Sequence, residues 1–387
     1  ATNIYDALTG TGTTFSGTKM IRTAGNMSDG GVSKEFGSTS PFLFPFGTAS
    51  DYTPATIQFS SAPSAWGTVN IKPVARYQNY VTSSNSLDYY WKVTSTGFSG
   101  LPANSISHTY RYVDSDIRGT EANYIPGVYR PYSWTYINDI AQVVDANNEI
   151  RFWNISNVDG DYTAGELSAF GTVKVFYSRQ NGNWEDVNTW SSVSVGGPVD
   201  GALPGASNPV VIGDGNTLNH TVTITTNNKT TGGLEIRSGS VLDIGTTTGH
   251  NFGALPDSKI LGTGKIRISS SVATATFPAG DFGNFLSSGG GTVEYYTTGT
   301  TNFTLPTTKT SYNNLIISPA SAQTITFPNI SLRIYDDLLI SGTGTGVAQF
   351  NSAAAQTLTV DSNLIVNGGI LRFMNNNNAQ TVNVNGD

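Results

Sequence analysis

Three similar phrases recur in the second half of the chain at a nearly constant spacing. The phrases N-L-I-I-S, D-L-L-I-S-G and N-L-I-V-N-G place Leu315, Leu338 and Leu364 at intervals of 23 and 26 residues. A period in the low twenties, with short strands in each repeat, is typical of a β-solenoid, in which stacked coils bury one continuous core. We therefore predict a right-handed parallel β-solenoid, or β-helix, over residues 179–387, truncated at its C-terminal end.

The preceding residues show a different pattern. Between residues 41 and 178, alternating or aromatic segments recur about every 12 to 20 residues, separated by Gly, Pro, Asn and Asp. This spacing predicts an antiparallel β-sandwich. The expected strands are Ala55–Phe59, Thr68–Val74, Tyr89–Val93, Ser107–Tyr112, Ile150–Trp153 and Thr172–Tyr177. Residues 1–40 are rich in Gly, Thr and Ser, and we expect them to be a lead-in, or the end of a preceding module.

The composition supports an all-β chain and excludes several functions. Charged residues make up only 12% of the chain, which has 43 glycines and a net charge of −7. The 20 Lys and Arg residues form no basic stripe, so nucleic acid is not an expected partner. No apolar run reaches the length that a membrane span needs, so no membrane insertion is expected. The zero cysteines exclude disulfides, and no signal peptide is visible, so we expect a segment of a longer protein.

Two tryptophans bracket two acidic residues at the junction of these zones. Trp184 and Trp190 flank Glu185 and Asp186. Such aromatic residues can stack on a sugar, and they are our candidate carbohydrate-binding residues; the alternative is that they cover the open end of the solenoid. Adjacent carboxylates on a strand point to opposite faces, so we assign no catalytic role to the pair.

Two acidic runs are candidate calcium sites. Alternating carboxylates in a loop suit calcium, which takes six to eight oxygen ligands. Neither run matches the EF-hand pattern, and ordinary Asp/Gly turns are the alternative interpretation. The candidate ligands are Asp114, Asp116 and Glu121 in the first run and Asp159, Asp161 and Glu166 in the second. No other cofactor is expected.

Two further functional classes stay open. Many β-helical proteins are polysaccharide lyases or hydrolases, but residues 179–387 are poor in the side chains that transfer protons. Thr-x-Thr pairs, which form flat arrays in β-helical ice-binding proteins, occur only at 223–225, 324–326 and 357–359. A polysaccharide-active enzyme and an ice-binding protein are therefore alternatives to a non-enzymatic role.

Several phrases, in this order, resemble modules of very large secreted surface proteins of Bacteroidetes, including gliding-motility adhesins exported by the type IX secretion system. The similarity covers roughly residues 40–387. The phrases are F-P-F-G-T-A-S-D-Y-T-P-A-T-I, Y-Y-W-K-V-T-S-T-G-F-S-G, D-S-D-I-R-G-T-E-A-N-Y, G-D-Y-T-A-G-E and F-Y-S-R-Q-N-G-N-W-E-D-V-N-T-W-S. The resemblance carries no catalytic residues to this chain, and the C-terminal sorting domain of that group is not among residues 1–387.

The resemblance implies an extracellular location on a bacterial cell and a role as a stalk or adhesive filament. We expect a non-enzymatic structural or adhesive protein that takes part in adhesion or gliding. Its expected partners are a surface polysaccharide or the substratum. Self-association, or continuation into further modules of the same chain, is also expected, because an open solenoid end exposes unpaired strand edges.

Overall fold

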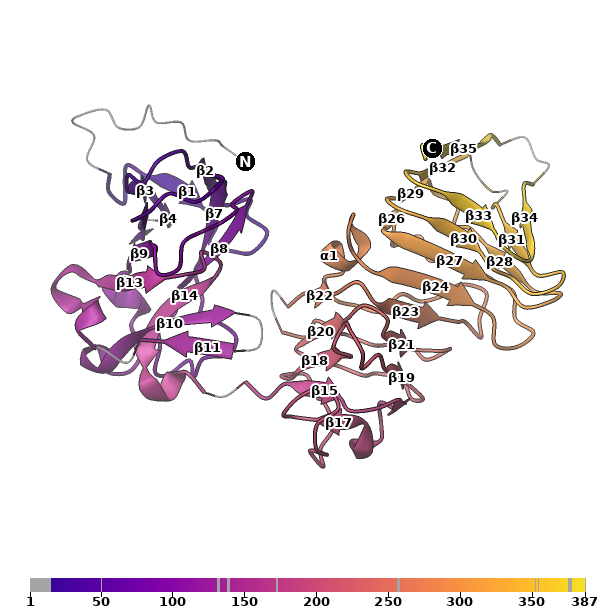
Figure 1. Cartoon of the computed structure of the whole chain (residues 1–387), viewed down its shortest axis with the longest axis horizontal. Coiled ribbons are helices and arrows are strands. Elements are labelled where there is room, and N and C mark those ends of the chain that lie inside the picture. The colour runs from indigo at the N-terminus through magenta and orange to yellow at the C-terminus, as the bar shows by residue number, and fades with distance from the viewer. Residues whose placement is uncertain are drawn as a thin grey trace. The chain divides into compact units, whose positions relative to one another are not determined.

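A computed structural model describes residues 15–386, except residues 50, 131–132, 138–139, 172, 256–257, 352, 354 and 375–377. The described chain is nearly all β and divides into two units, Ala1–Val173 and Lys174–Asp387. Antiparallel sheets make up the first unit and a parallel β-solenoid makes up the second, so the predicted fold class is confirmed (Figure 1).

Two antiparallel sheets form the body of the first unit. The larger has the strand order β11 (Ser133–Tyr136), β10 (Tyr124–Arg130), β14 (Gly160–Glu166), β8 (Tyr90–Thr96), β7 (Thr68–Val74) and β2 (Val32–Glu35). The smaller has the order β12 (Val143–Val144), β13 (Glu149–Ile155), β9 (Ile106–Arg111), β6 (Ala55–Phe59) and β3 (Phe42–Phe44). A third sheet contains β1 (Ile21–Thr23), β4 (Phe46–Thr48) and β5 (Asp51–Tyr52). Short 3-10 helices connect the strands: η2 (Asp114–Asp116), η3 (Glu121–Asn123), η4 (Ile140–Gln142), η5 (Asp145–Asn147) and η6 (Leu167–Ala169).

Aromatic residues fill the space between the two larger sheets. Trp91 on β8 stacks on Tyr110 of β9 with ring centroids 4.7 Å apart, and both side chains are fully buried. The Trp91 indole donates a hydrogen bond of 3.0 Å to the carbonyl of Thr53. Because alternate residues of each strand point inward, one face of each sheet reaches this core and the other stays available at the surface.

Two predicted boundaries are wrong. The described part of the expected lead-in contains β1 and β2, which pair with β4 and β7, so these residues belong to the sheets. A strand this short still contributes backbone hydrogen bonds, and Val32 adds a buried side chain. In addition, the strand expected to end the sandwich is β15 (Phe176–Ser178), which pairs with β18 (Pro209–Ile212) of the solenoid. The units therefore divide before residue 174, because Phe176 packs in the solenoid core.

Four sheets build the solenoid in the described residues. One has the order β17 (Trp190–Ser191), β15, β18, β20 (Gly233–Ile236) and β22 (Ile260–Leu261), and another contains β25 (Phe303–Thr304), β28 (Thr324–Thr326), β31 (Val347–Gln349) and β34 (Ile370–Arg372). A third contains β26 (Ser311–Tyr312), β29 (Leu332–Ile334), β32 (Gln356–Val360) and β35 (Gln380–Val384). The longest is β16 (Gly182–Asn183), β19 (Thr221–Thr223), β21 (Val241–Asp243), β23 (Lys265–Ile268), β24 (Thr292–Tyr296), β27 (Asn314–Ser318), β30 (Leu338–Ile340) and β33 (Leu364–Val366). The short helices are η7 (Val187–Thr189) and α1 (Gly283–Leu286).

One aliphatic ladder runs through the longest sheet, which receives one strand from each coil. Its members are consecutive parallel register partners with no exposed surface: Val222, Leu242, Ile266, Val293, Leu315 and Leu338. Leu338 is in turn the partner of Leu364, so the spacing seen in the sequence is the height of one coil. The strands are parallel, and their handedness stays a prediction. Within the described ranges, no helix is long and apolar enough to cross a membrane.

We predict that Leu338→Ala lowers the free energy of unfolding of the solenoid by about 3 kcal/mol, because it leaves a cavity in the aliphatic ladder. Leu339→Ala is the matched control, because Leu339 is the next residue of β30 and its side chain points outward and is only half-buried. It should cost less than about 1 kcal/mol. Urea unfolding followed by circular dichroism measures both, and equal losses would contradict the assigned register.

Candidate functional site

Trp184 and Trp190 lie inside the first coil of the solenoid. Their side chains are 1% and 0% exposed, and their rings meet edge to face at 4.9 Å. The Trp190 indole donates a hydrogen bond of 2.9 Å to the carbonyl of Trp184. Neither ring offers a face to a sugar, so the carbohydrate-binding hypothesis is wrong for these two residues. They instead close the N-terminal end of the solenoid core, as the alternative interpretation states.

The two acidic residues between the tryptophans stabilise separate local structures. Glu185 accepts hydrogen bonds of 2.9 Å from the hydroxyl groups of Thr225 and Thr226 and pairs with Lys229 at 3.3 Å. Partial burial acts to raise the Glu185 pKa, but these hydrogen bonds outweigh it and lower the pKa to about 2. Asp186 caps the 3-10 helix η7. The pair does not converge on one bond, as a glycosidase requires.

We predict that Trp184→Ala lowers the free energy of unfolding by about 3 to 5 kcal/mol, because a fully buried indole is removed. Trp153→Ala is the control for loss of an indole, because Trp153 on β13 is 52% exposed. The control should change stability by less than about 1 kcal/mol. Thermal unfolding measures both variants, and a smaller effect at Trp184 than at Trp153 would contradict its role as a cap.

The first acidic run does not assemble a metal site. Asp114 accepts a hydrogen bond from the amide of Asn148, and Glu121 accepts one from the hydroxyl of Tyr112. Asp116, on the same 3-10 helix as Asp114, keeps its Oδ2 atom buried without a hydrogen-bond partner. Among the described residues, no group of three or more His, Cys, Asp or Glu side chains could hold a metal ion.

Asp116 is the carboxyl group whose titration is displaced toward neutral pH. Burial raises its pKa from 3.8 to about 7, and the negative charges of Asp51 and Asp88 add to this effect, while Arg118 partly opposes it. The folded state therefore holds the Asp116 proton more tightly than the unfolded state does. The stability that follows from this difference is present below pH about 4 and is lost as the pH rises through about 7.

We predict that Asp116→Asn raises the melting temperature at pH about 8 by about 2 °C, because it removes the cost of a buried charge. At pH about 4 the carboxyl group is protonated in both states, so the variant and the wild type should melt together. Thermal unfolding across this pH range measures the difference. A difference that does not change with pH would contradict the raised pKa.

The second acidic run is divided between two places. Asp161 pairs with Lys92 at 3.0 Å and accepts a hydrogen bond of 3.2 Å from Gln78. Glu166 lies at the other end of β14, where it accepts a hydrogen bond of 2.7 Å from the backbone N–H of Thr120. A lysine beside Asp161 disfavours a second cation. Calcium binding at either run stays a prediction, which calorimetric titration of the chelator-treated protein with calcium tests; the absence of both heat and thermal shift would contradict it.

Asp159 and Asp161 nevertheless line one surface groove of about 330 Å³. The groove lies where β14 begins, between β8 and β10, and it includes Gly160. Gly160 has φ +151°, and a Cβ atom there would lie 2.5 Å from the Val128 side chain, so the chain requires glycine at this position. The volume falls at the lower end of the range for ligand pockets.

The groove presents both charges and an aromatic ring. Arg130 donates hydrogen bonds of 2.9 Å and 3.0 Å to the carbonyls of Asp159 and Asn157, which fix its guanidinium. The Tyr129 ring stacks on Tyr80 with centroids 4.7 Å apart. The Asp159 carboxylate accepts no hydrogen bond from the described residues, and its Oδ1 atom is buried without a partner. Such a group has unused capacity to accept hydrogen bonds.

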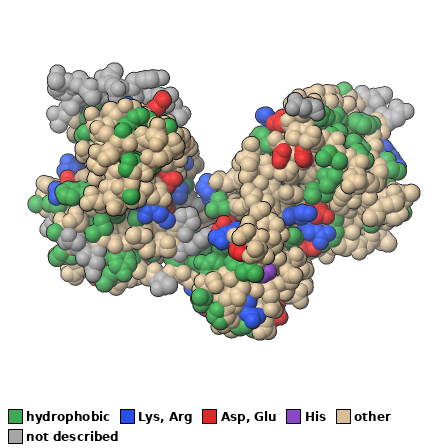
Figure 2. Space-filling model, in the orientation of Figure 1, with side chains coloured by type: hydrophobic (Ala, Val, Ile, Leu, Met, Phe, Trp, Pro, Cys, Tyr) green, Lys and Arg blue, Asp and Glu red, His purple; other side chains and the backbone are tan. Residues whose placement is uncertain are grey.

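A network of charges runs along the outer surface of the longest solenoid sheet. Arg267 pairs with Asp243 at 2.8 Å and with Glu294 at 3.2 Å, so it connects three consecutive strands. Lys265 pairs with Glu294 at 3.1 Å, and the hydroxyl of Tyr296 donates to Asp243 at 2.7 Å. Figure 2 shows acidic and basic side chains next to one another on a surface that is otherwise mostly uncharged.

The carboxylates of the solenoid are held in the ionised form. Burial raises the pKa of Glu294, but Lys265 and Arg267 outweigh burial and lower it. Every described solenoid carboxylate with a displaced pKa is lowered: Glu185, Asp200, Asp214, Glu294 and Asp337. A general acid for glycoside cleavage requires a raised pKa, which is the opposite shift.

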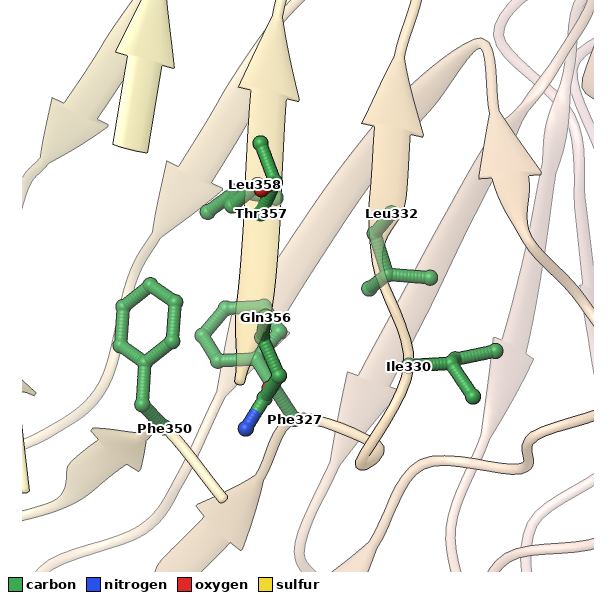
Figure 3. Close-up of a pocket in the computed structure, with 7 residues that line it drawn as sticks. All are labelled: Phe327, Ile330, Leu332, Phe350, Gln356, Thr357 and Leu358. Atoms are coloured by element: carbon green, nitrogen blue, oxygen red, sulfur yellow. The ribbon is translucent and has the colours of Figure 1, made fainter. Parts of the chain in front are cut away.

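Two other features carry no ligand site or surface array. A crevice between Phe327, Leu332 and Phe350 has a volume of about 10 Å³, which holds no more than about one water molecule (Figure 3). The threonines of β28 have Val347 and Gln349 as their register partners in the next coil. The Thr-x-Thr pattern is therefore not continued there.

A comparison with protein-family models, curated proteins and solved structures finds no match to this chain. The groove is thus defined by its own geometry. Sequence reasoning selected Asp159 and Asp161 but missed Lys92, Tyr129 and Arg130, which neighbouring strands bring beside them. The available signal was that Lys92 and Tyr129 interrupt apolar strands at positions that face away from the core.

Proposed function

We propose that this chain is a non-enzymatic structural and adhesive module on the outside of a bacterial cell. The aliphatic ladder carries the proposal, because it joins coil after coil into one core. A solenoid of this kind resists bending, since every coil is bonded to the next through parallel strands. The charge network around Arg267 adds contacts between coils on the surface.

The electrostatics of the solenoid support a role without catalysis. The rival function is a polysaccharide-active enzyme, which needs one carboxyl group that stays protonated near neutral pH. The displaced carboxylates of the solenoid are shifted the other way, and each has a hydrogen-bonding or cationic partner. They strengthen the coil contacts rather than act on a substrate.

Exposed apolar residues on the last described coil support assembly with further coils. Ile365, Val366 and Ile370 are 41%, 51% and 42% exposed, whereas their register partners one coil earlier include the buried Ile340 and Val347. Another copy, or a further module, that adds a strand at this edge would bury them. The resemblance to secreted adhesins of Bacteroidetes supports the extracellular location and a polysaccharide or substratum as the partner.

We predict that beads coated with the full chain adhere to polysaccharide-coated surfaces under flow. Leu338→Ala beads should adhere as well at rest but detach at lower flow, because the softened solenoid transmits less force. Leu339→Ala beads should behave as the wild type. Equal detachment of all three would contradict the mechanical role.

The same surfaces test the enzymatic alternative. Release of reducing sugar from cellulose, chitin and alginate should stay at the level of uncoated beads, with and without calcium. Turnover that a single carboxylate substitution abolishes would overturn the proposed function.

A further inference from the structure

The side chains of the groove at the start of β14 offer hydrogen-bond acceptors and donors together. The Asp159 carboxylate accepts no hydrogen bond from the described residues, so it is free to accept from a ligand. Lys92 has three N–H donors, and the recorded partner of its ammonium group within the groove is Asp161. Thr94 adds an exposed hydroxyl group at the rim. A ligand that both donates and accepts hydrogen bonds at adjacent atoms matches this set.

The formal charges of the groove cancel. Lys92 and Arg130 contribute two positive charges, and Asp159 and Asp161 contribute two negative charges. A cationic ligand would meet Lys92 and Arg130, and an anionic ligand would meet the two carboxylates, so each pays an electrostatic cost. The arrangement therefore favours a ligand that is polar and uncharged.

An aromatic surface completes the groove. Tyr129 lines it, and the stack of its ring on Tyr80 holds the ring in place. A fixed ring can pack against the C–H groups of a ligand without a large loss of side-chain freedom. A ligand with polar edges and an apolar face is a sugar ring.

We propose that this groove binds one neutral sugar residue of a surface polysaccharide, with Asp159 accepting from its hydroxyl groups, Lys92 donating to them, and Tyr129 packing on the ring. The inference rests on the adhesive role proposed above and assigns it to one place on the sandwich unit. Arg130 acts as a positioning residue, because its hydrogen bonds to the carbonyls of Asp159 and Asn157 shape the loop that carries Asp159.

The test measures binding of the methyl glycosides of glucose, galactose, mannose and N-acetylglucosamine to the full chain by saturation-transfer NMR and calorimetry. We expect at least one of them to bind, and Asp159→Asn to weaken its affinity about tenfold, because a charged acceptor is lost. Thr94→Trp should abolish binding by filling the groove from an exposed position that does not support the core. This second variant keeps the test decisive if Asp159→Asn lowers stability.

Two control variants locate the site. Asp114→Asn removes a carboxylate of the same unit outside the groove, and Trp153→Ala removes an exposed indole on the other large sheet. Both should bind as the wild type does. Loss of binding in Trp153→Ala with full binding in Asp159→Asn would overturn the location.

Two further outcomes overturn the ligand class. No binding of any neutral glycoside to the wild type would do so, and so would tighter binding of methyl glucuronide than of methyl glucoside. Bead adhesion separates this inference from the proposed function. If the wild-type and Asp159→Asn beads adhere equally, the groove assignment fails and the adhesive role stands; if neither adheres, the proposed function itself fails.

Discussion

The register between consecutive coils is the constraint on which the solenoid depends. Each inward aliphatic residue of the longest sheet lies over its partner from the next coil, as Ile266 lies under Val293 and Leu315 under Leu338. A shift of one residue would turn each strand over and place Lys265 and Arg267 in the core. The same register sets the surface, because Arg267 reaches Asp243 and Glu294 only when the strands β21, β23 and β24 are aligned.

The sandwich unit is built on a different principle, and this leaves it room for a site. Its core consists of large aromatic rings, with Trp91 stacked on Tyr110 between the sheets, and not of identical repeats. The outer face of the larger sheet can therefore differ from strand to strand. At the start of β14, beside Gly160, that freedom produces a groove lined by charged and aromatic side chains.

Much of the fold can be predicted from the sequence because the repeating residues point inward at every coil. The segments Lys265–Ile268, Thr292–Tyr296 and Leu338–Ile340 have the predicted bounds. The strand around Phe176 was assigned to the wrong unit, because a short alternating strand looks the same in a sandwich and in a solenoid. The groove was half-visible: its carboxylates are adjacent in sequence, but Lys92 comes from a strand about 70 residues earlier, and no local pattern encodes that pairing.

The tryptophan-closed first coil has a consequence for the order of folding. Gly182 of β16 pairs with Val222, 40 residues later, whereas the later coils of this sheet are closed by 20 to 27 residues. The entropic cost of closing a loop grows with its length, so the regular coils form with less delay and the closed end joins them afterwards. Until it does, the edges of β18 and β19 are open to strands from other chains. The cap therefore also sets how long a newly made chain is exposed to aggregation.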